Sequence, residues 1–128
     1  MFKMLFYYFY LFLSKNLCNF VPNFEQYVYF IRVKMNRRFY VISYDLKISG
    51  RDYTSLYEAI KSYNEWQHPL ESTWIVYTSE TANAISAKLR SDGKMDNSDL
   101  LFVCALEIND RQGWLDKSVW NWIKSHIK

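Results

Sequence analysis

Two patterns of apolar and polar positions alternate between residues 38 and 108. The segments 38–45, 66–70, 73–78 and 100–108 are rich in β-branched and aromatic residues and are bounded by turn residues, which is typical of strands. Around 53–64 and 79–90, apolar residues recur every three to four positions, which predicts two helices. The order strand-helix-strand-strand-helix-strand predicts an α+β sandwich with the ferredoxin-like βαββαβ arrangement.

The apolar residues also suggest where each strand lies in the sheet. Segment 38–45 carries apolar groups on both faces, which suits a central strand. Segment 100–108 is almost continuously apolar, so we expect a strand in the middle of a covered sheet, with Cys104 as a small core residue. Pro69 cannot donate to a strand ladder, so segment 66–70 is expected to be an edge, a bulge or a bend.

The helix boundaries have their own signals. Asp52 and Ser79 precede the two helical segments, where their side chains can accept hydrogen bonds from free backbone N–H groups. After the last strand, segment 117–126 has a helical apolar pattern and is rich in Trp. This added C-terminal helix needs a surface to cover.

The first 34 residues differ from the rest, so we divide the chain into an extension, 1–34, and a domain, 35–128. Ten consecutive apolar residues lie between Lys3 and Ser14, about half of what a membrane-spanning helix needs. No small-residue cleavage site of a signal peptide follows them. Three interpretations stay open: an upstream extension from a misplaced start codon before Met35, an apolar anchor at a membrane, or an extra element packed on the domain. Membrane association is expected only in the second case.

Composition and charge narrow the function classes. Half of the residues are apolar and 20% are aromatic, which excludes a disordered chain. The net charge of +3 comes from residues 1–34, because residues 35–128 hold twelve basic and twelve acidic side chains. A neutral domain is not a typical nonspecific nucleic-acid binder and needs a local basic patch, a metal ion or oligomerisation to approach phosphate. The two cysteines lack zinc-site spacing, and they fit a reducing cytoplasm.

Asp45 is the strongest candidate for a catalytic or metal-binding residue. A carboxylate at the end of a central strand can hold a hard cation such as Mg²⁺ or Mn²⁺, although position alone favours a capping or turn carboxylate. A second ligand could come from Asp99 or from Asp45 of another copy. Arg37 and Arg38 could contact phosphate.

The remaining polar residues give weaker indications of a functional site. Asp92, Asp96 and Asp99 are expected to form a solvated loop, and their spacing does not match a calcium-binding loop. His68 and His126 show no sign of catalysis. The sequence contains no P-loop, GxSxG or GxGxxG motif.

Four motifs together resemble a known family. VISYDL at 41–46, ESTWIVYTS at 71–79 and DLLFVCALE at 99–107 are similar to the signature strands of the SinR-like proteins. These proteins are relatives of the small CRISPR-associated nucleases that partner the adaptation integrase. The tail GWLDKSVWNWIK at 113–124 resembles the SinR-like branch in particular. The resemblance covers about residues 35–124.

The resemblance implies a ferredoxin-like fold and a homodimer, often assembled through the last strands. For the CRISPR-associated branch it also implies an endonuclease whose strand-end Asp residues meet at the dimer interface around a metal ion. Carried over, that residue is Asp45. We therefore predict a metal-dependent phosphodiesterase that acts on RNA or DNA, with Mg or Mn as cofactor. The alternative is a non-catalytic dimeric module that binds a protein partner in a defence, toxin–antitoxin or mobile-element system.

Overall fold

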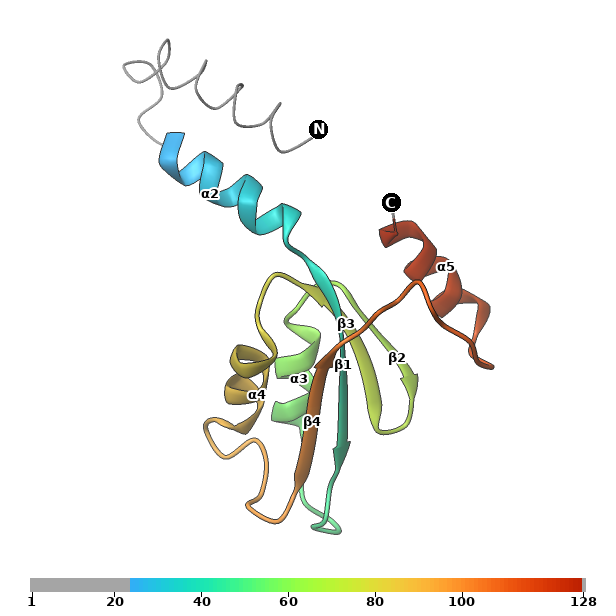
Figure 1. Ribbon diagram of the computed structural model, residues 1–128. Coiled ribbons are helices and arrows are strands. Elements are labelled where there is room, and N and C mark those ends of the chain that lie inside the picture. Colours follow the sequence, from blue (N-terminus) through green and yellow to red (C-terminus); the bar gives the residue numbers. More distant parts are fainter. Residues whose placement is uncertain (1–23, 128) are drawn as a thin grey trace. The chain divides into compact units, whose positions relative to one another are not determined.

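The computed structural model describes residues 24–127 and divides the chain into two compact units, 1–35 and 36–128 (Figure 1). Each unit is described by itself. The first contains helix α2, Phe24–Met35. The apolar run between Lys3 and Ser14 lies outside the described residues, so the three interpretations of the extension stay predictions. Of the helices described, none has the length and apolar character needed to cross a bilayer.

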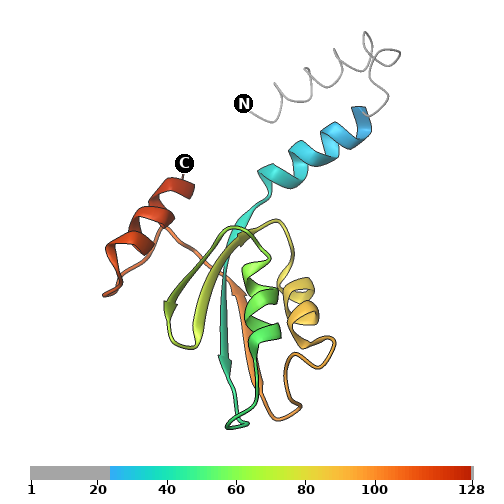
Figure 2. The ribbon, with the colours of Figure 1, turned by 180° about the vertical axis from the view of Figure 1, so that it is seen from behind.

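The second unit is a mixed α+β domain, as predicted. Its elements are β1 (Arg38–Asp45), α3 (Thr54–Lys61), β2 (Trp66–Leu70), β3 (Thr73–Thr78), α4 (Ala82–Arg90), β4 (Leu100–Ala105) and α5 (Lys117–His126). The strands form one antiparallel sheet in the order β2-β3-β1-β4. Helices α3 and α4 cover one face of this sheet (Figures 1 and 2). The predicted bounds of β1, β2, β3 and α5 are confirmed.

The main core lies between the sheet and these two helices. Side chains alternate across a strand, so Tyr40, Ile42 and Tyr44 of β1 all point toward the helices. Ile42 is fully buried, as are three apolar residues of α3 and α4 that recur at helical spacing and form the predicted stripes, namely Leu56, Ile60 and Ile85. Within this core, the Trp74 indole N–H of β3 donates to the Tyr44 hydroxyl oxygen of β1, at 3.0 Å.

A smaller core lies on the opposite face. Val119 and Ile123 of α5 are buried there against Phe39 of β1 and Ile75 of β3. The C-terminal helix therefore covers part of the sheet, as its amphipathic pattern predicts.

The helix caps differ partly from the expectation. Asp52 accepts a hydrogen bond from the Thr54 backbone N–H at 2.8 Å, as predicted, but the N-cap position of α3 is Tyr53, which makes no side-chain cap hydrogen bond. The cap of α4, however, is Thr81 and not Ser79. Thr81 has an extended backbone that places its hydroxyl oxygen 3.2 Å from the Ala84 N–H, the usual geometry of an N-cap.

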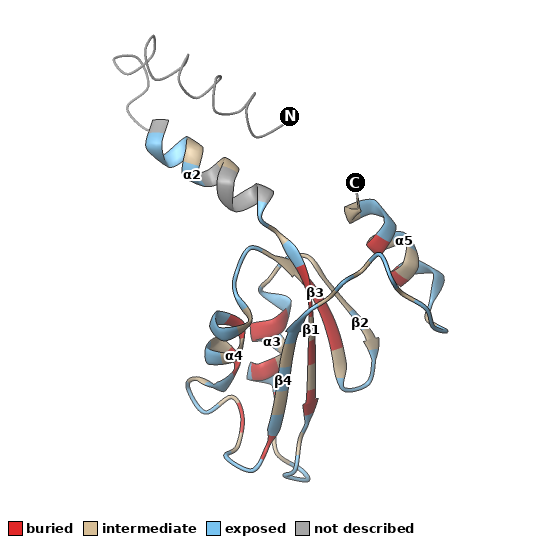
Figure 3. Ribbon diagram, in the orientation of Figure 1, coloured by how far each residue is buried: buried red, intermediate tan, exposed pale blue. Residues whose placement is uncertain are grey.

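Strand β4 corrects a larger prediction. It ends at Ala105 and forms an edge of the sheet instead of its middle. Its residues are exposed or half-buried along the whole strand (Figure 3). Cys104 is exposed instead of buried. Leu101 and Val103 pack against the main core, while Leu100 and Phe102 point to the other face. An apolar run indicates which residues avoid water, but it carries no information on strand order.

Candidate functional site

Asp45 lies at the end of β1, as predicted, and opposite Leu100 of β4. Its side chain is 60% exposed and forms an ion pair with Lys47. Both side chains are largely in water, where such pairs contribute little to stability. Asp45 is thus an accessible carboxylate with a cation already beside it.

Arg37 and Arg38 lie at the other end of β1. Seven residue steps of about 3.3 Å place Arg38 roughly 23 Å from Asp45 along the strand. Arg37 forms an ion pair with Glu65, and its guanidinium lies 5.8 Å from the centre of the Tyr77 ring. Arg38 is exposed and faces Thr78 across the ladder. The structure therefore does not bring the predicted metal ligand and the predicted phosphate contacts together.

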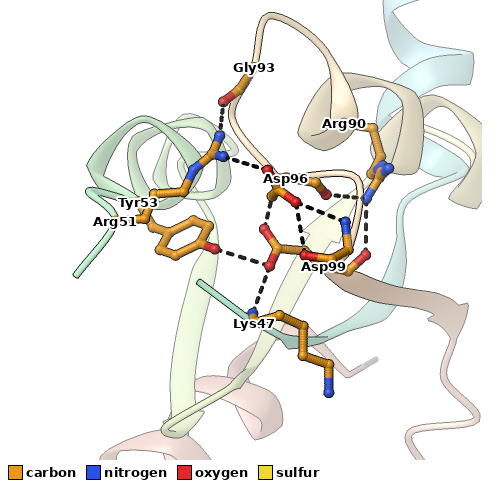
Figure 4. Close-up of polar contacts among 8 residues, drawn as sticks. Lys47, Arg51, Tyr53, Arg90, Gly93, Asp96 and Asp99 are labelled. Carbon is orange, nitrogen blue, oxygen red and sulfur yellow. Dashed lines mark hydrogen bonds and ion pairs between the residues drawn. The ribbon is translucent and has the colours of Figure 1, made fainter. Parts of the chain in front are cut away.

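Asp99 is the only buried charged residue of the described domain, which corrects its prediction as part of a solvated loop. One carboxylate oxygen accepts hydrogen bonds from the Lys47 backbone N–H at 2.7 Å and from the Tyr53 hydroxyl at 3.0 Å (Figure 4). The other oxygen accepts from the Asp96 backbone N–H at 2.7 Å. Burial raises the pKa of Asp99, but these hydrogen bonds outweigh burial and hold the pKa below its usual value.

Two arginines complete the network in Figure 4. Arg51 donates to the Asp96 carboxylate at 3.1 Å and to the Gly93 carbonyl at 2.6 Å. Arg90 donates to the backbone carbonyls of Asp96 and Asp99 at 3.2 and 3.1 Å. The segment before β4 is thereby fastened to the segment after β1. Asp99 therefore has a structural role, because its carboxylate oxygens accept hydrogen bonds from groups on both segments.

The donor set of a single chain does not fit the magnesium or manganese site that the resemblance implies. Residues 24–127 contain no cluster of three or more His, Cys, Asp or Glu side chains that could hold a metal ion. Asp45 offers one carboxylate, and Asp99, its predicted second ligand, already accepts three hydrogen bonds. A hard cation needs more oxygen ligands than Asp45 alone supplies.

The more prominent feature is an apolar surface on the face that α3 and α4 leave free. Leu100 and Phe102 of β4 are 60% and 62% exposed there, and Cys104 is exposed beside them. Leu70, on the same face of β2, is 55% exposed. We call these four residues the open face. Leu100, Phe102 and Cys104 follow one another on β4, whereas Ser43 and Thr73 lie between Phe102 and Leu70 across the sheet. The exposed apolar side chains of β4 are therefore the candidate interaction site.

The backbone of β4 also has an unused side. Leu106 N–H donates to the Phe39 carbonyl at 2.9 Å, so alternate residues from 100 to 106 bond to β1. The residues between them direct their N–H and C=O groups away from β1, at the edge of the sheet. These residues are Leu101, Val103 and Ala105.

The two edges of the sheet differ. Strand β2 contains Pro69, which has no N–H, and its pairing with β3 shifts register between Gln67 and Leu70. The predicted edge or bulge at Pro69 is confirmed. Strand β4, with the sequence LLFVCA, has no proline and no charge. Prolines, bulges and charges are the usual devices that keep an edge from pairing with another chain.

Sequence reasoning missed Glu65, which binds both Arg37 and His126. Burial raises its pKa, but the hydrogen bonds from His126 and Arg37 outweigh burial and leave the pKa below its usual value. Because Glu65 and His126 are 61 positions apart, no local pattern could join them. The only signal was the Trp-rich amphipathic pattern of α5, which predicted that the helix packs its apolar side against another part of the chain.

Comparisons of the chain with protein-family models, curated proteins and solved structures give no match. The resemblance to the SinR-like proteins rests on the four short motifs, and what it implies about activity stays a prediction.

Proposed function

We propose that this chain is a homodimeric interaction module with a ferredoxin-like fold, in which β4 of one copy pairs with β4 of a second copy. The βαββαβ order and two helices on one face of the sheet support the ferredoxin-like assignment. The observation that carries the dimer is the contrast between the two edges: β2 is protected by Pro69 and a register shift, whereas β4 is unprotected.

Pairing of β4 with a second β4 satisfies the symmetry of a dimer. Two identical strands related by a two-fold axis run antiparallel, so each contributes the same surface. The free N–H and C=O groups of Leu101, Val103 and Ala105 would then bond to their counterparts. Phe102 would approach the partner strand on the open face, and its 62% exposed ring would be covered.

Helix α5 disfavours the other simple arrangement, in which two open faces stack. Stacked sheets lie about 10 Å apart, the thickness of two layers of side chains. Helix α5 is already packed on that face through Val119 and Ile123. A second sheet therefore cannot lie flat over the whole face while α5 is in place.

Edge pairing has a direct consequence for Asp45. From β1 through β4 and its symmetry mate to the second β1 there are three strand spacings, or about 14 Å at about 4.8 Å each. Two carboxylates that share one cation lie much closer, because metal–oxygen distances are about 2.1 Å for Mg²⁺. An edge-paired dimer therefore has no shared Asp45 metal site, which supports the non-catalytic alternative.

The test compares two matched substitutions on the open face, Phe102→Lys on β4 and Leu70→Lys on β2. We expect light scattering after size exclusion to give twice the chain mass for the native protein and for Leu70→Lys. For Phe102→Lys we expect one chain mass at micromolar concentration, with the dissociation constant raised at least ~100-fold, about 2.7 kcal/mol. A native monomer, or equal loss of dimer in both variants, would contradict edge pairing.

A protein partner is the expected ligand of the dimer, in a cytoplasmic defence, toxin–antitoxin or mobile-element system. This setting follows from the resemblance to the SinR-like proteins.

A metal-dependent nuclease is the second candidate, and the exposed carboxylate of Asp45 favours it. It requires a dimer that brings two Asp45 side chains together, and therefore a pairing other than β4 with β4. If it is correct, cleavage of RNA or DNA with added Mg²⁺ or Mn²⁺ falls at least ~100-fold in Asp45→Ala and stays unchanged in Asp110→Ala, a loop carboxylate. Equal activity in the two variants would reject Asp45 as the metal ligand.

A further inference from the structure

Edge pairing of β4 leaves part of the sheet uncovered. Leu100, Phe102 and Cys104 belong to the open face, and the first two are 60% and 62% exposed. We call these three residues the β4 strip. A second β4 in the same sheet approaches the strip only from the side, so the surfaces that point away from the sheet stay in contact with water. In the proposed dimer, two strips lie next to each other and form one apolar patch.

The free backbone groups of β4 determine how the two strips lie. A two-fold pairing that uses the N–H and C=O groups of Leu101, Val103 and Ala105 places Val103 opposite Val103 of the second copy. Phe102 then lies opposite Cys104 of the second copy. The patch is therefore centred on the two-fold axis, with one Phe102 on each side of it.

Helix α5 forms a wall on each side of this patch. It packs on Phe39 of β1 and Ile75 of β3, so its axis lies over the space between these two strands. Three strand spacings separate the two β1 strands of the dimer. Half a spacing more on each side leads to the two α5 axes, which are about 19 Å apart across the sheet at about 4.8 Å per spacing. Packed helices lie about 8–10 Å apart, so one helix fits between the two α5 helices.

The chain itself shows how a helix binds this sheet face. Val119 and Ile123, one turn apart on α5, bury their side chains against Phe39 and Ile75. A partner helix with apolar residues at the same spacing can place them on the β4 strips in the same way. A second sheet is disfavoured there by α5, whereas a single helix needs only the gap between the two walls.

The charges around the patch indicate the kind of helix that binds. The β4 strip is uncharged, and Asp45 beside it is already paired with Lys47. Helix α5 has no acidic residue and carries two exposed lysines, Lys117 and Lys124. They are two turns apart and therefore lie on the same side of the helix. Both helices that border the gap thus carry positive charge, which favours an acidic partner.

We propose that the dimer binds an acidic amphipathic helix of a protein partner in the gap between its two α5 helices, with one helix per dimer. The apolar side of this helix covers the two β4 strips, and its acidic flanks meet Lys117 and Lys124. This proposal rests on the proposed function, because a single copy provides only one strip and one wall.

A constrained helical peptide of about 15 residues, about 22 Å long, tests the site. Its leucines recur every three to four positions, and its flanks carry glutamates. We expect calorimetry on the native protein to give one peptide per two chains and a dissociation constant below ~100 μM. The same peptide with lysines in place of the glutamates should bind at least about tenfold more weakly. Equal binding of the two peptides, one peptide per single chain, or no binding would overturn the proposal.

Two charge reversals provide a matched comparison. Lys117→Glu reverses a charge on α5, whereas Lys61→Glu reverses one on α3, on the opposite face of the sheet. We expect Lys117→Glu to weaken binding of the acidic peptide at least about fivefold, and Lys61→Glu to change it by less than about twofold. Amide chemical shifts of the native protein should change in β4 and α5 and stay constant in α3. Equal effects of the two variants, or shift changes centred on α3, would place the peptide elsewhere and reject the site.

Light scattering separates this proposal from the dimer on which it rests. Lys61 and Lys117 lie outside β4, so both variants should keep twice the chain mass. A native protein of one chain mass would contradict edge pairing and the helix site with it. A dimer that does not prefer the acidic peptide would contradict the helix site alone.

Discussion

Replacement of Asp99 by alanine is expected to destabilise the domain by about 3 kcal/mol, because it leaves buried donors without an acceptor. The carboxylate accepts from the backbone N–H groups of Lys47 and Asp96 and from the Tyr53 hydroxyl. Each buried donor that loses its partner costs about 1–3 kcal/mol, less where water can enter. Urea unfolding at pH 7, followed by Trp fluorescence, measures the loss.

Two variants separate the parts of this effect. Tyr53→Phe removes one donor and leaves Asp99 charged, so we expect a loss of about 1 kcal/mol. Asp99→Asn keeps one acceptor oxygen and turns an amide N–H₂ toward a backbone N–H, so we expect an intermediate loss. A stability of Asp99→Ala within about 0.5 kcal/mol of the native protein would show that the network contributes nothing.

Asp99 also predicts how stability depends on pH. Its pKa is lowered in the folded state, so its contribution is fully present above the unfolded value of about 3.9 and is lost as pH falls through the lower folded value. Glu65, Asp92 and Asp96, whose pKa values are also lowered, act in the same direction. We therefore expect Asp99→Asn to lose less stability than the native protein between pH 5 and pH 2. An unchanged acid dependence would contradict the role of Asp99.

Truncation of Leu56 to alanine is the second change with a large expected effect, about 3 kcal/mol. Leu56 is fully buried between α3 and the sheet, so its loss removes packing and leaves a cavity. Leu70→Ala is the matched control, because Leu70 is 55% exposed on the edge strand β2. We expect it to change the free energy of unfolding by less than about 0.5 kcal/mol. Equal losses would mean that the core is not where the structure places it.

The sequence predicts the local elements well because their signals are local. Alternation of apolar residues is enough to bound β1 and β3, and Pro69 is enough to mark an irregular edge. The two larger failures are of one kind. The position of β4 and the burial of Asp99 both depend on which segments become neighbours, and Asp99 lies 52 residues from Lys47, whose N–H it accepts. No pattern within one segment encodes such a pairing.

The same limit applies to the candidate site. The sequence singled out Asp45, Arg37 and Arg38, all on one strand, but it could not show that they lie at its opposite ends with Lys47 and Glu65 as their partners. The prediction of an accessible strand-end carboxylate is compatible with the structure. The prediction of Asp99 as a possible second ligand gains no support, because backbone donors already bond to that carboxylate.

The protected edge at β2 limits how many copies can associate. In the dimer that we propose, pairing of β4 with a second β4 would use the open edge of both copies and produce an eight-stranded sheet that ends in β2 on each side. Both ends then carry Pro69 and the shifted register, so neither offers a regular row of donors to a third chain. Assembly through strand edges would therefore stop at two copies. A chain with two open edges could grow into a fibre, whereas the proposed pairing would leave no open edge for a third copy.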